Sequence, residues 1–332
     1  MSTDTSDRLM LLDAASLYYR AFFGVPATVT APDGTPVNAV RGFLDMITRL
    51  VDDHAPTHLV ACWDDDWRPA WRVAAMPSYK THRVAGAVVP GAGGAPQGNP
   101  PEATGAGAVV PEETPDALEP QVPVIVEVLA ALGIARVGAL GCEADDVIGT
   151  LATRAPVGTA VDIVTGDRDL FQLVDDDRRV RVLYTGRGVR NLELLDQAAL
   201  QAKYAVGTGD LYADLAVLRG DPSDGIPGVS GIGEKTAATL LARYGDLGGL
   251  RDAVDTGDRS LKPGVRAALE AARDYLDSAP AVVRVLRDAD LPGADDRVPP
   301  VPADPAALDA LAQRWGLASS LERLLPVLAA RA

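Results

Sequence analysis

Cysteine and long apolar runs are scarce in this sequence. The two cysteines, Cys62 and Cys142, are too few for a disulfide framework or a cysteine-based zinc motif, and they indicate a reducing, cytoplasmic environment. The longest apolar runs, such as Leu59–Trp63, have the length of a strand, which excludes a transmembrane helix and a membrane partner. Residues 1–7 are polar and acidic, which is the wrong chemistry for a signal peptide.

Positive charge is also in short supply. The chain of 332 residues holds 31 Lys and Arg against 46 Asp and Glu, a formal net charge of −15. At first sight, an acidic excess of this size argues against a nucleic-acid partner. Apolar residues make up 47% and charged residues 23% of the chain, which excludes a fibrous or wholly disordered protein. The length suggests two domains, or one large domain with an appendage.

Apolar runs that alternate with helical patterns fill the first 190 residues. Strands are predicted at Arg8–Asp13, His58–Trp63, Ala135–Ala139, Val161–Val164 and Val180–Tyr184. Helices are predicted at Ser16–Phe23, Asn38–Asp53, Pro120–Leu132, Asp145–Arg154 and Asp169–Val174. This alternation predicts an α/β fold with a mostly parallel sheet over residues 1–190. From Leu195 onward the pattern is helical, so residues 191–332 are expected to form a second, helical domain.

Two segments differ from the rest in composition. Ala85–Gly107 is rich in Gly, Ala and Pro and is predicted to be a flexible insert, because it has too few large apolar residues to order itself. Leu291–Pro305 is rich in Pro and Asp and is expected to cross between helical pieces as an extended chain.

Acidic residues follow the carboxyl ends of several predicted strands. They are Asp13, Asp64, Glu143, Asp145, Asp146, Asp167 and Asp169. A single Asp after a strand is usually a helix cap or a turn residue, but ligands of parallel α/β sheets gather at this edge. So many like charges in one place require cations, and hard oxygen ligands without His or Cys favour Mg²⁺ or Mn²⁺ over zinc. The pattern predicts two or more metal ions that activate water against a phosphodiester.

A glycine-rich turn follows in the helical half. Asp221 and Asp224 lie in the turn GDPSDGIP, which read alone is an ordinary surface turn. The next segment, GVSGIGEKTAATLL at residues 228–241, predicts a hairpin followed by a helix. Such a hairpin can hold a DNA backbone through N–H groups and the positive end of the helix. The alternative is a turn between two helices that binds nothing.

One segment reverses the sign of the charge. Between Trp67 and Val110 four bases face a single acid, a local net charge of +3. Trp67, Trp71 and Tyr79 alternate with these bases, as stacking on unpaired nucleotides would require. A solvated loop with incidental charge is the competing interpretation.

In this order, the motifs resemble the bacterial 5′-nuclease family, which comprises the 5′-to-3′ exonuclease domain of DNA polymerase I and stand-alone flap endonucleases. The resemblance rests on LMLLDAASLYYRAFF, CWDDDWRPAWR, SYKTHR, CEADDVIGTLA, DIVTGDRDLFQLV and GDPSDGIPGVSGIGEKTAATLL, which run from residue 9 to about residue 245. It implies a PIN-like α/β core, a helical arch over the site, and a helix–hairpin–helix subdomain that binds DNA.

The resemblance also implies roles for particular residues. The metal-binding acids would be Asp13, Asp64, Glu143, Asp145, Asp146, Asp167, Asp169, Asp221 and Asp224. Lys80 and Arg83 match arch bases that contact the scissile phosphate. Contacts with DNA are expected from Arg20, Arg72, Tyr79, Gly231, Gly233, Lys235 and Thr236. In this family the hairpin often binds a potassium ion, K⁺, through backbone carbonyls.

The chain departs from the family pattern in two places. The family usually has Asn after Ser-Asp, where this chain has Gly225, and the missing amide could loosen the turn that presents Asp221 and Asp224. The stretch from Arg83 to Glu143 is longer than usual, so threading of a single strand under the arch could differ.

These features predict a stand-alone, monomeric, two-metal 5′ nuclease that cleaves 5′ flaps, nicks and RNA-primer junctions, with a replication or repair polymerase as a candidate partner. A DNA-binding relative with weak catalysis and a PIN-type ribonuclease are the alternatives. The net charge of −15 is compatible with a DNA partner because the acidic residues are unevenly distributed along the chain. Two narrow surfaces, the arch segment and residues 225–287, escape the acidic excess and would face DNA.

Overall fold

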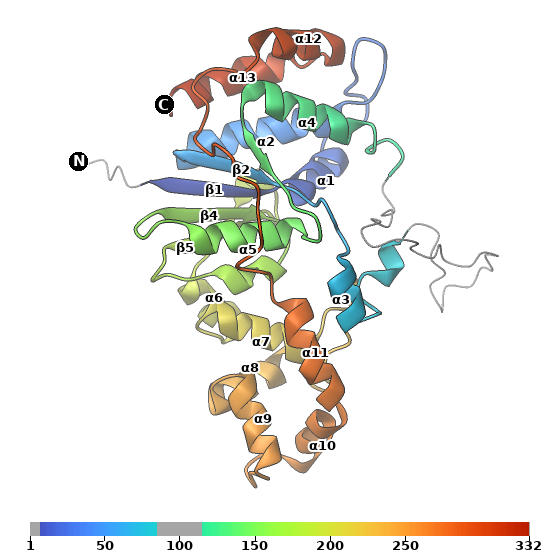
Figure 1. Ribbon diagram of the computed structural model, residues 1–332, viewed down its shortest axis with the longest axis vertical. Coiled ribbons are helices and arrows are strands. Elements are labelled where there is room, and N and C mark those ends of the chain that lie inside the picture. The colour runs from blue at the N-terminus through green and yellow to red at the C-terminus, as the bar shows by residue number, and fades with distance from the viewer. Residues whose placement is uncertain (1–6, 85–114, 332) are drawn as a thin grey trace, which may run out of the picture.

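The computed structural model describes residues 7–84 and 115–331. The predicted flexible insert at 85–107 therefore lies outside the described residues, as does the part of the expected arch that follows Val84. Figure 1 shows an elongated molecule with a layered sheet at one end and a group of helices at the other.

A six-stranded sheet forms the centre of the layered end. Its strands are β1 (Arg8–Asp13), β2 (His58–Cys62), β3 (Ala135–Val137), β4 (Ala160–Thr165), β5 (Val180–Tyr184) and β6 (Glu193–Leu195). Their order is β3-β2-β1-β4-β5-β6, and every neighbouring pair is parallel except β5 and β6. The expected mostly parallel sheet is confirmed. The sequence did not indicate β6, because three residues with one buried side chain carry no alternating pattern.

Both faces of the sheet are buried, as the apolar strands predict. In β1, Leu9 and Leu11 pack into one hydrophobic core, while Met10 and Leu12 pack into the other. Successive side chains of a strand point to opposite faces, so one short apolar run serves two cores.

The core that contains Met10 and Leu12, called the first core, lies under α1 (Ala14–Gly24), α2 (Asn38–His54) and α4 (Gln121–Leu132). These helices cover one face of the sheet (Figure 1). Two C-terminal helices, α12 (Pro305–Trp315) and α13 (Ala318–Ala329), pack on this same layer through Leu308, Leu321, Leu324 and Leu328. This packing corrects the expected bounds of the second domain, 191–332. Residues 305–331 join the first unit because their apolar stripes are buried against α2 and α4.

The second core lies under α5 (Ala144–Arg154), α6 (Gln197–Tyr204) and α7 (Gly209–Arg219) on the other face. The predicted helix at Asp169–Val174 is present as a short 3₁₀ turn, η2 (Asp169–Leu173). This face continues into the far end of the molecule, so the second core is shared between the sheet and the helical unit.

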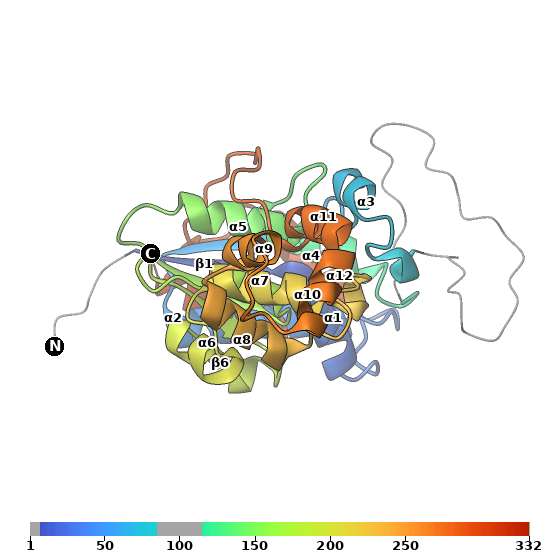
Figure 2. The ribbon, with the colours of Figure 1, turned by 90° about the horizontal axis from the view of Figure 1, so that it is seen from below.

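The far end consists of α8 (Glu234–Tyr244), α9 (Leu247–Asp255), α10 (Pro263–Ala271) and α11 (Arg273–Val283). Figure 2, which views the molecule from below, shows these helices gathered beneath the sheet, with α3 (Ala70–Ala75) close to α11. Residues 220–233 connect α7 to α8 as the predicted helix–hairpin–helix. The expected extended crossing is confirmed, since Asp296 and Val298 pair with the start of β2 on the way to α12. Within 7–84 and 115–331, no helix is long and apolar enough to span a bilayer.

Candidate active site

The parallel strands deliver acidic side chains to one cavity of about 630 Å³. Six of the nine predicted acids line it, namely Asp13, Asp64, Glu143, Asp145, Asp167 and Asp221. Asp13 ends β1 directly beside Cys62 of β2, Asp64 follows β2 by two residues, and Asp167 follows β4. Glu143 is the N-cap of α5, so the start of that helix brings its carboxylates to the same edge.

Asp13 lines the cavity, and both of its carboxylate oxygens accept hydrogen bonds. Its Oδ2 accepts a hydrogen bond of 2.7 Å from Thr165 Oγ1, and its Oδ1 accepts one of 3.0 Å from the backbone N–H of Ser16. Thr165 Oγ1 also accepts the N–H of Asp167 at 2.8 Å. Thr165 thus orients two acids from neighbouring strands. No motif in the sequence singles out Thr165, whose signal is its place at the end of the fourth strand, before Gly166-Asp167.

Burial, and then the charges of neighbouring acids, raise the pKa values of these carboxylates. Burial and the charge of Asp64 raise the pKa of Asp13 to about 7. Burial, together with Asp167 and Asp13, raises the pKa of Asp145 well above its usual range. A group of carboxylates in this condition is stabilised by positive charge, which a divalent cation supplies.

Lys80 is the ammonium group inside the cavity. Its Nζ lies 2.5 Å from Glu143 Oε2, and Tyr79 donates its hydroxyl to Glu143 Oε1 at 2.8 Å. Burial would lower the pKa of Lys80, but Glu143 raises it well above its usual range, so Lys80 stays charged. The ring of Tyr79 is 4% exposed, which contradicts the predicted stacking of this residue on a base.

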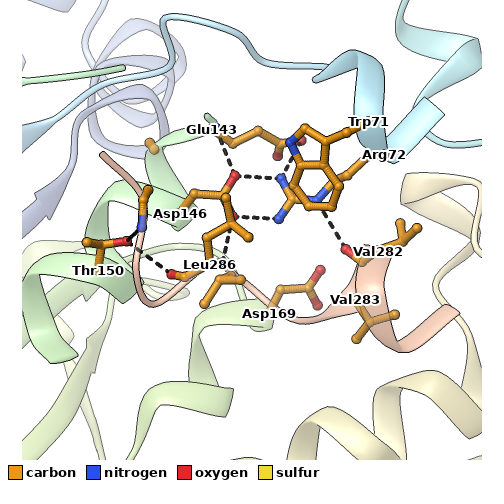
Figure 3. A network of polar contacts seen from close by, with 12 residues as sticks. Trp71, Arg72, Glu143, Asp146, Thr150, Asp169, Val282, Val283 and Leu286 are labelled. Carbon is orange, nitrogen blue, oxygen red and sulfur yellow. Dashed lines mark hydrogen bonds and ion pairs between the residues drawn. The ribbon is translucent and has the colours of Figure 1, made fainter. Parts of the chain in front are cut away.

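Arg72 and Asp146 lie behind the cavity in a buried network (Figure 3). Both Asp146 oxygens accept hydrogen bonds from the Arg72 guanidinium, at 2.7 and 2.6 Å. Asp146 also accepts the N–H groups of Glu143 and Leu286, and Arg72 Nε donates to the carbonyl of Val282. Arg72 is 2% exposed and Asp146 0%.

This network corrects two predictions. Asp146 does not line the cavity, and its oxygens already serve Arg72 and two backbone N–H groups, so the predicted metal-ligand role does not fit its position. Arg72 is too deeply buried to contact DNA. The motif spacing could not reveal this, because the partner carboxylate is 74 residues away along the chain.

Two further predicted acids, Asp169 and Asp224, lie close to the cavity without lining it. Asp224 lies in the turn η4 (Pro222–Asp224) and forms an ion pair of 2.7 Å with Arg83, which lines the cavity. Asp169, at the start of η2, is half-buried. Its pKa is raised well above the usual range by burial and by Asp167 and Asp224. Asp169 and Asp224 are therefore electrostatic neighbours of the cavity, although they do not line it.

The donor set consists of carboxylate oxygens, the ligands that Mg²⁺ and Mn²⁺ prefer. Across residues 7–84 and 115–331, no three acidic, His or Cys side chains converge on one point closely enough to hold an ion as they stand. Several of these oxygens accept hydrogen bonds instead, as in Asp13 and in Asp64, whose Oδ1 accepts the N–H of Ala144. Binding of a cation would require these carboxylates to turn.

The residues predicted to contact DNA are spread over two places. Arg20 is half-buried on α1 near Gly166, at the cavity. Gly231 and Gly233 are exposed on the hairpin before α8, and in the first turn of α8 Lys235 is exposed and Thr236 is half-buried. Two aromatic side chains from the basic segment are packed in place: Trp67 is 9% exposed, and Trp71 donates its Nε1–H to the carbonyl of Gly141 at 3.0 Å.

Comparison with known proteins identifies both parts of the chain. Residues 8–205 match the 5′-3′ exonuclease N-terminal resolvase-like domain, and residues 208–305 match the 5′-3′ exonuclease C-terminal SAM fold. The fold is similar to that of the T5 5′-exonuclease, at a TM-score of 0.60 and 16% identity over 97% of this chain and 99% of that one. It also resembles the catalytic core of Rad2, at a TM-score of 0.56 and 16% identity over 97% and 92% of the two chains.

Sequence relatives extend over nearly the whole chain. A 5′-3′ exonuclease of Streptomyces coelicolor is 61% identical over 97% of this chain and all of its own length. A 5′-3′ exonuclease of Mycobacterium tuberculosis is 49% identical over 95% of this chain and 96% of its own. DNA polymerase I of Mycobacterium bovis is 41% identical over 79% of this chain but only 26% of its own length. The chain belongs to the 5′-3′ exonuclease family.

Proposed function

We propose that this 5′ nuclease hydrolyses DNA phosphodiesters at 5′ flaps, nicks and RNA-primer junctions, with two divalent cations at the acidic cavity. The observation that carries the proposal is the group of carboxylates from three strand ends and α5, whose pKa values are raised by burial and by the neighbouring acids, as in Asp13 and Asp145. Divalent cations would relieve this repulsion. A protein of the same fold, the T5 5′-exonuclease, has been solved with divalent zinc ions bound, which supports a metal-dependent reaction.

Carboxylates of the cavity would hold the cations. Asp13, Asp64, Glu143 and Asp145 form one wall, and Asp167, Asp169, Asp221 and Asp224 lie towards the helical unit. When bound, Mg²⁺ or Mn²⁺ would neutralise charge on the phosphodiester and activate water for its hydrolysis. Thr165 contacts Asp13, and Arg72 holds Asp146 at the start of α5, so the segments that carry the first wall are anchored before any ligand binds.

Lys80 and Arg83 would act on the phosphate itself. Both line the cavity, and both carry positive charge paired with an acid, Glu143 and Asp224 respectively. A positive group held in place inside an acidic cavity offsets negative charge that develops on a phosphate during hydrolysis. Contact with the phosphate would require Arg83 to exchange Asp224 for the substrate.

The hairpin before α8 would hold the duplex beside the cavity. Gly231 and Gly233 are exposed there, Lys235 is exposed in the first turn of α8, and the N–H groups at the start of that helix favour an anion. The catalytic core of Rad2, which shares the fold, has been solved with a DNA substrate, which supports a DNA partner here. A potassium ion at the hairpin, a polymerase partner, a monomeric state and a cytoplasmic location stay predictions.

Cleavage of defined substrates tests the proposal. The intact chain is incubated with 5′-labelled flap, nicked, gapped and blunt duplexes in the presence of Mg²⁺ or Mn²⁺. We expect cleavage of flaps and nicks that is lost in Asp167→Ala and kept in Asp290→Ala, which removes an exposed acid outside the cavity. Absence of cleavage of every substrate, or cleavage that Asp167→Ala leaves unchanged, would refute the proposal. Preference for single-stranded RNA would favour a ribonuclease.

A further inference from the structure

The turn at 221–226 has an unusual backbone at the position where the family usually has Asn. Gly225 lies in the left-handed region at φ +71° and ends the 3₁₀ turn η4. Asp221 and Ile226 close this turn with a pair of backbone hydrogen bonds of 2.9 and 2.8 Å. The turn is therefore well formed without the amide side chain, contrary to the expectation that Gly225 loosens it.

This turn is fastened to the segment that carries Lys80 and Arg83, two of the basic residues that line the cavity. Ser78 Oγ donates to the carbonyl of Gly225 at 2.7 Å, and the N–H of Lys80 donates to the carbonyl of Asp224 at 2.9 Å. Arg83 Nη2 donates to Asp224 Oδ1 at 2.7 Å and to the carbonyl of Ser223 at 3.3 Å. We call these contacts, between residues 78–83 and 223–225, the clasp.

The clasp leaves no room for a side chain at position 225. A Cβ atom built on Gly225 would lie 2.1 Å from the carbonyl oxygen of Ser78 and 3.0 Å from its carbonyl carbon. Both are backbone atoms, so they can yield only if the segment before Lys80 moves. Asn adopts the left-handed conformation more readily than most residues, but it has the same Cβ and would meet the same obstacle.

Lys80 depends on the clasp for its own conformation. It lies at φ +48°, a left-handed backbone that is unfavourable for a residue other than glycine. The hydrogen bond from its N–H to Asp224 holds that backbone in place, and the side chain then reaches Glu143 across the cavity. A shift of Ser78 would change the direction of the Lys80 side chain.

We propose that Gly225 is a positioning residue, which aims Lys80 and Arg83 at the cavity by allowing the 221–226 turn to clasp the backbone of residues 78–83. The inference rests on the proposed function, in which these two bases act on the phosphate. In this chain the close approach of position 225 to the carbonyl of Ser78 requires glycine. Replacement of Gly225 by the family's Asn would therefore harm the site rather than improve it.

Hydrogen exchange of the protein without metal or DNA tests the clasp directly. Gly225→Ala and Gly225→Asn are compared with Gly316→Ala, which places the same methyl group at φ +65° with no contact closer than 3.5 Å. We expect the amides of peptides spanning residues 78–84 to exchange about tenfold faster in both Gly225 variants, and to be unchanged in the control. Unchanged exchange in the Gly225 variants would overturn the proposal, whatever the activity.

Kinetics on a flap substrate test the consequence. We expect kcat to fall about tenfold in Gly225→Ala with KM and the Mg²⁺ requirement within about twofold, since Lys80 is displaced while DNA and metal contacts stay. Lys80→Ala should then cost less in the Gly225→Ala background than alone. The positioning role would be refuted if the losses in kcat of Gly225→Ala and Lys80→Ala simply multiplied in the double variant. An effect of Gly225→Ala on KM alone would also refute it. If the wild-type chain cleaves none of the substrates, the proposed function fails, while the exchange measurement still decides the clasp.

Discussion

The carboxylate of Asp146 is bound on both oxygens by the guanidinium of Arg72, and the neighbouring acid, Asp145, faces the cavity. Two consecutive acids of one motif therefore have different tasks. Asp145 contributes to the acidic wall, whereas Asp146 ties α3 to α5 and, through the N–H of Leu286, to the chain that leaves α11. The buried pair joins the helical unit to the site.

Replacement of Asp146 should therefore destabilise the fold. Asp146→Ala leaves the Arg72 guanidinium buried with Glu143 as its remaining acidic partner, at 3.3 Å. Removal of one partner from a buried ion pair costs about 3–5 kcal/mol where the other charge is left uncompensated, and Glu143, which also pairs with Lys80, compensates Arg72 only in part. We expect a decrease of this size in the free energy of unfolding, measured by urea denaturation without metal.

Asp145→Ala is the matched control for that measurement. The pKa of Asp145 is raised by burial and by neighbouring acids, so its removal relieves repulsion and should not lower the free energy of unfolding. It should abolish cleavage of a flap substrate. If the two variants lose the same stability and bind metal equally weakly, Asp146 is a metal ligand after all.

Tyr79 should contribute to stability rather than to DNA affinity. Its hydroxyl donates to Glu143 Oε1 and its ring is buried, so a nucleotide base cannot stack on it in this arrangement. Tyr79→Phe removes one hydrogen bond to a charged group, which contributes about 1.5–3 kcal/mol. We expect that loss in urea denaturation, and a Kd for flap DNA within about twofold of the wild type by fluorescence anisotropy. A tenfold weaker Kd with unchanged stability would restore the stacking role.

The strands and the acids of the cavity could be predicted because their signals are local. The run RLMLLD is apolar on both faces and ends in Asp13, which is enough to place a buried strand and an acid at its carboxyl end. The same strand-end argument predicts Asp64, Glu143 and Asp167 at this edge, and all three line the cavity.

Roles that depend on distant partners could not be predicted. The alternation of bases and aromatic residues in the segment after Trp67 looks the same whether the side chains face DNA or pack inward. Arg72 faces inward because Asp146 and the carbonyl of Val282 meet it there, from elements far along the chain. The position of α13 is another such case, because an apolar stripe does not specify whether it covers α2 or the helical unit.

The stability of the metal-free protein should fall as pH rises. Asp13 has a pKa of about 7 in the folded protein against an ordinary value of 3.8. Its folded state therefore binds the proton more tightly, and the stability that this supplies below about pH 4 is lost as pH rises through 7. Differential scanning calorimetry in EDTA should show a decreasing Tm over this range. Mg²⁺ should raise Tm more at high pH than at low pH, because protons and cations compete for the same oxygens.

Asp13→Asn provides the control for this dependence. It keeps the size of the side chain and removes the titrating group, so the fall in Tm should become shallower while Mg²⁺ raises Tm less. A metal-free Tm that rises steadily between about pH 4 and pH 7 would contradict the raised pKa of Asp13.

Two glycines of the hairpin should separate folding from DNA binding. Gly228 lies at φ +69°, and a Cβ atom there would be 2.4 Å from the carbonyl oxygen of Arg219, so Gly228→Ala should lower stability by distorting the end of α7. Gly233 has an ordinary backbone at φ −86° and open space around it, so Gly233→Ala should fold normally.

Because Gly233 is exposed and has open space around it, Gly233→Ala tests directly whether the hairpin contacts DNA. If a phosphate approaches the exposed backbone at the start of α8, the added methyl group obstructs it, and Kd for duplex DNA should weaken while urea denaturation stays unchanged. Lys235→Ala should instead reduce the slope of log Kd against log salt by about one, since one phosphate contact is lost. The two effects differ in kind, because a methyl group blocks approach at every salt concentration whereas a lost charge matters most at low salt. A Gly233→Ala protein that binds duplex DNA like the wild type at all salt concentrations would place the duplex elsewhere on the helical unit.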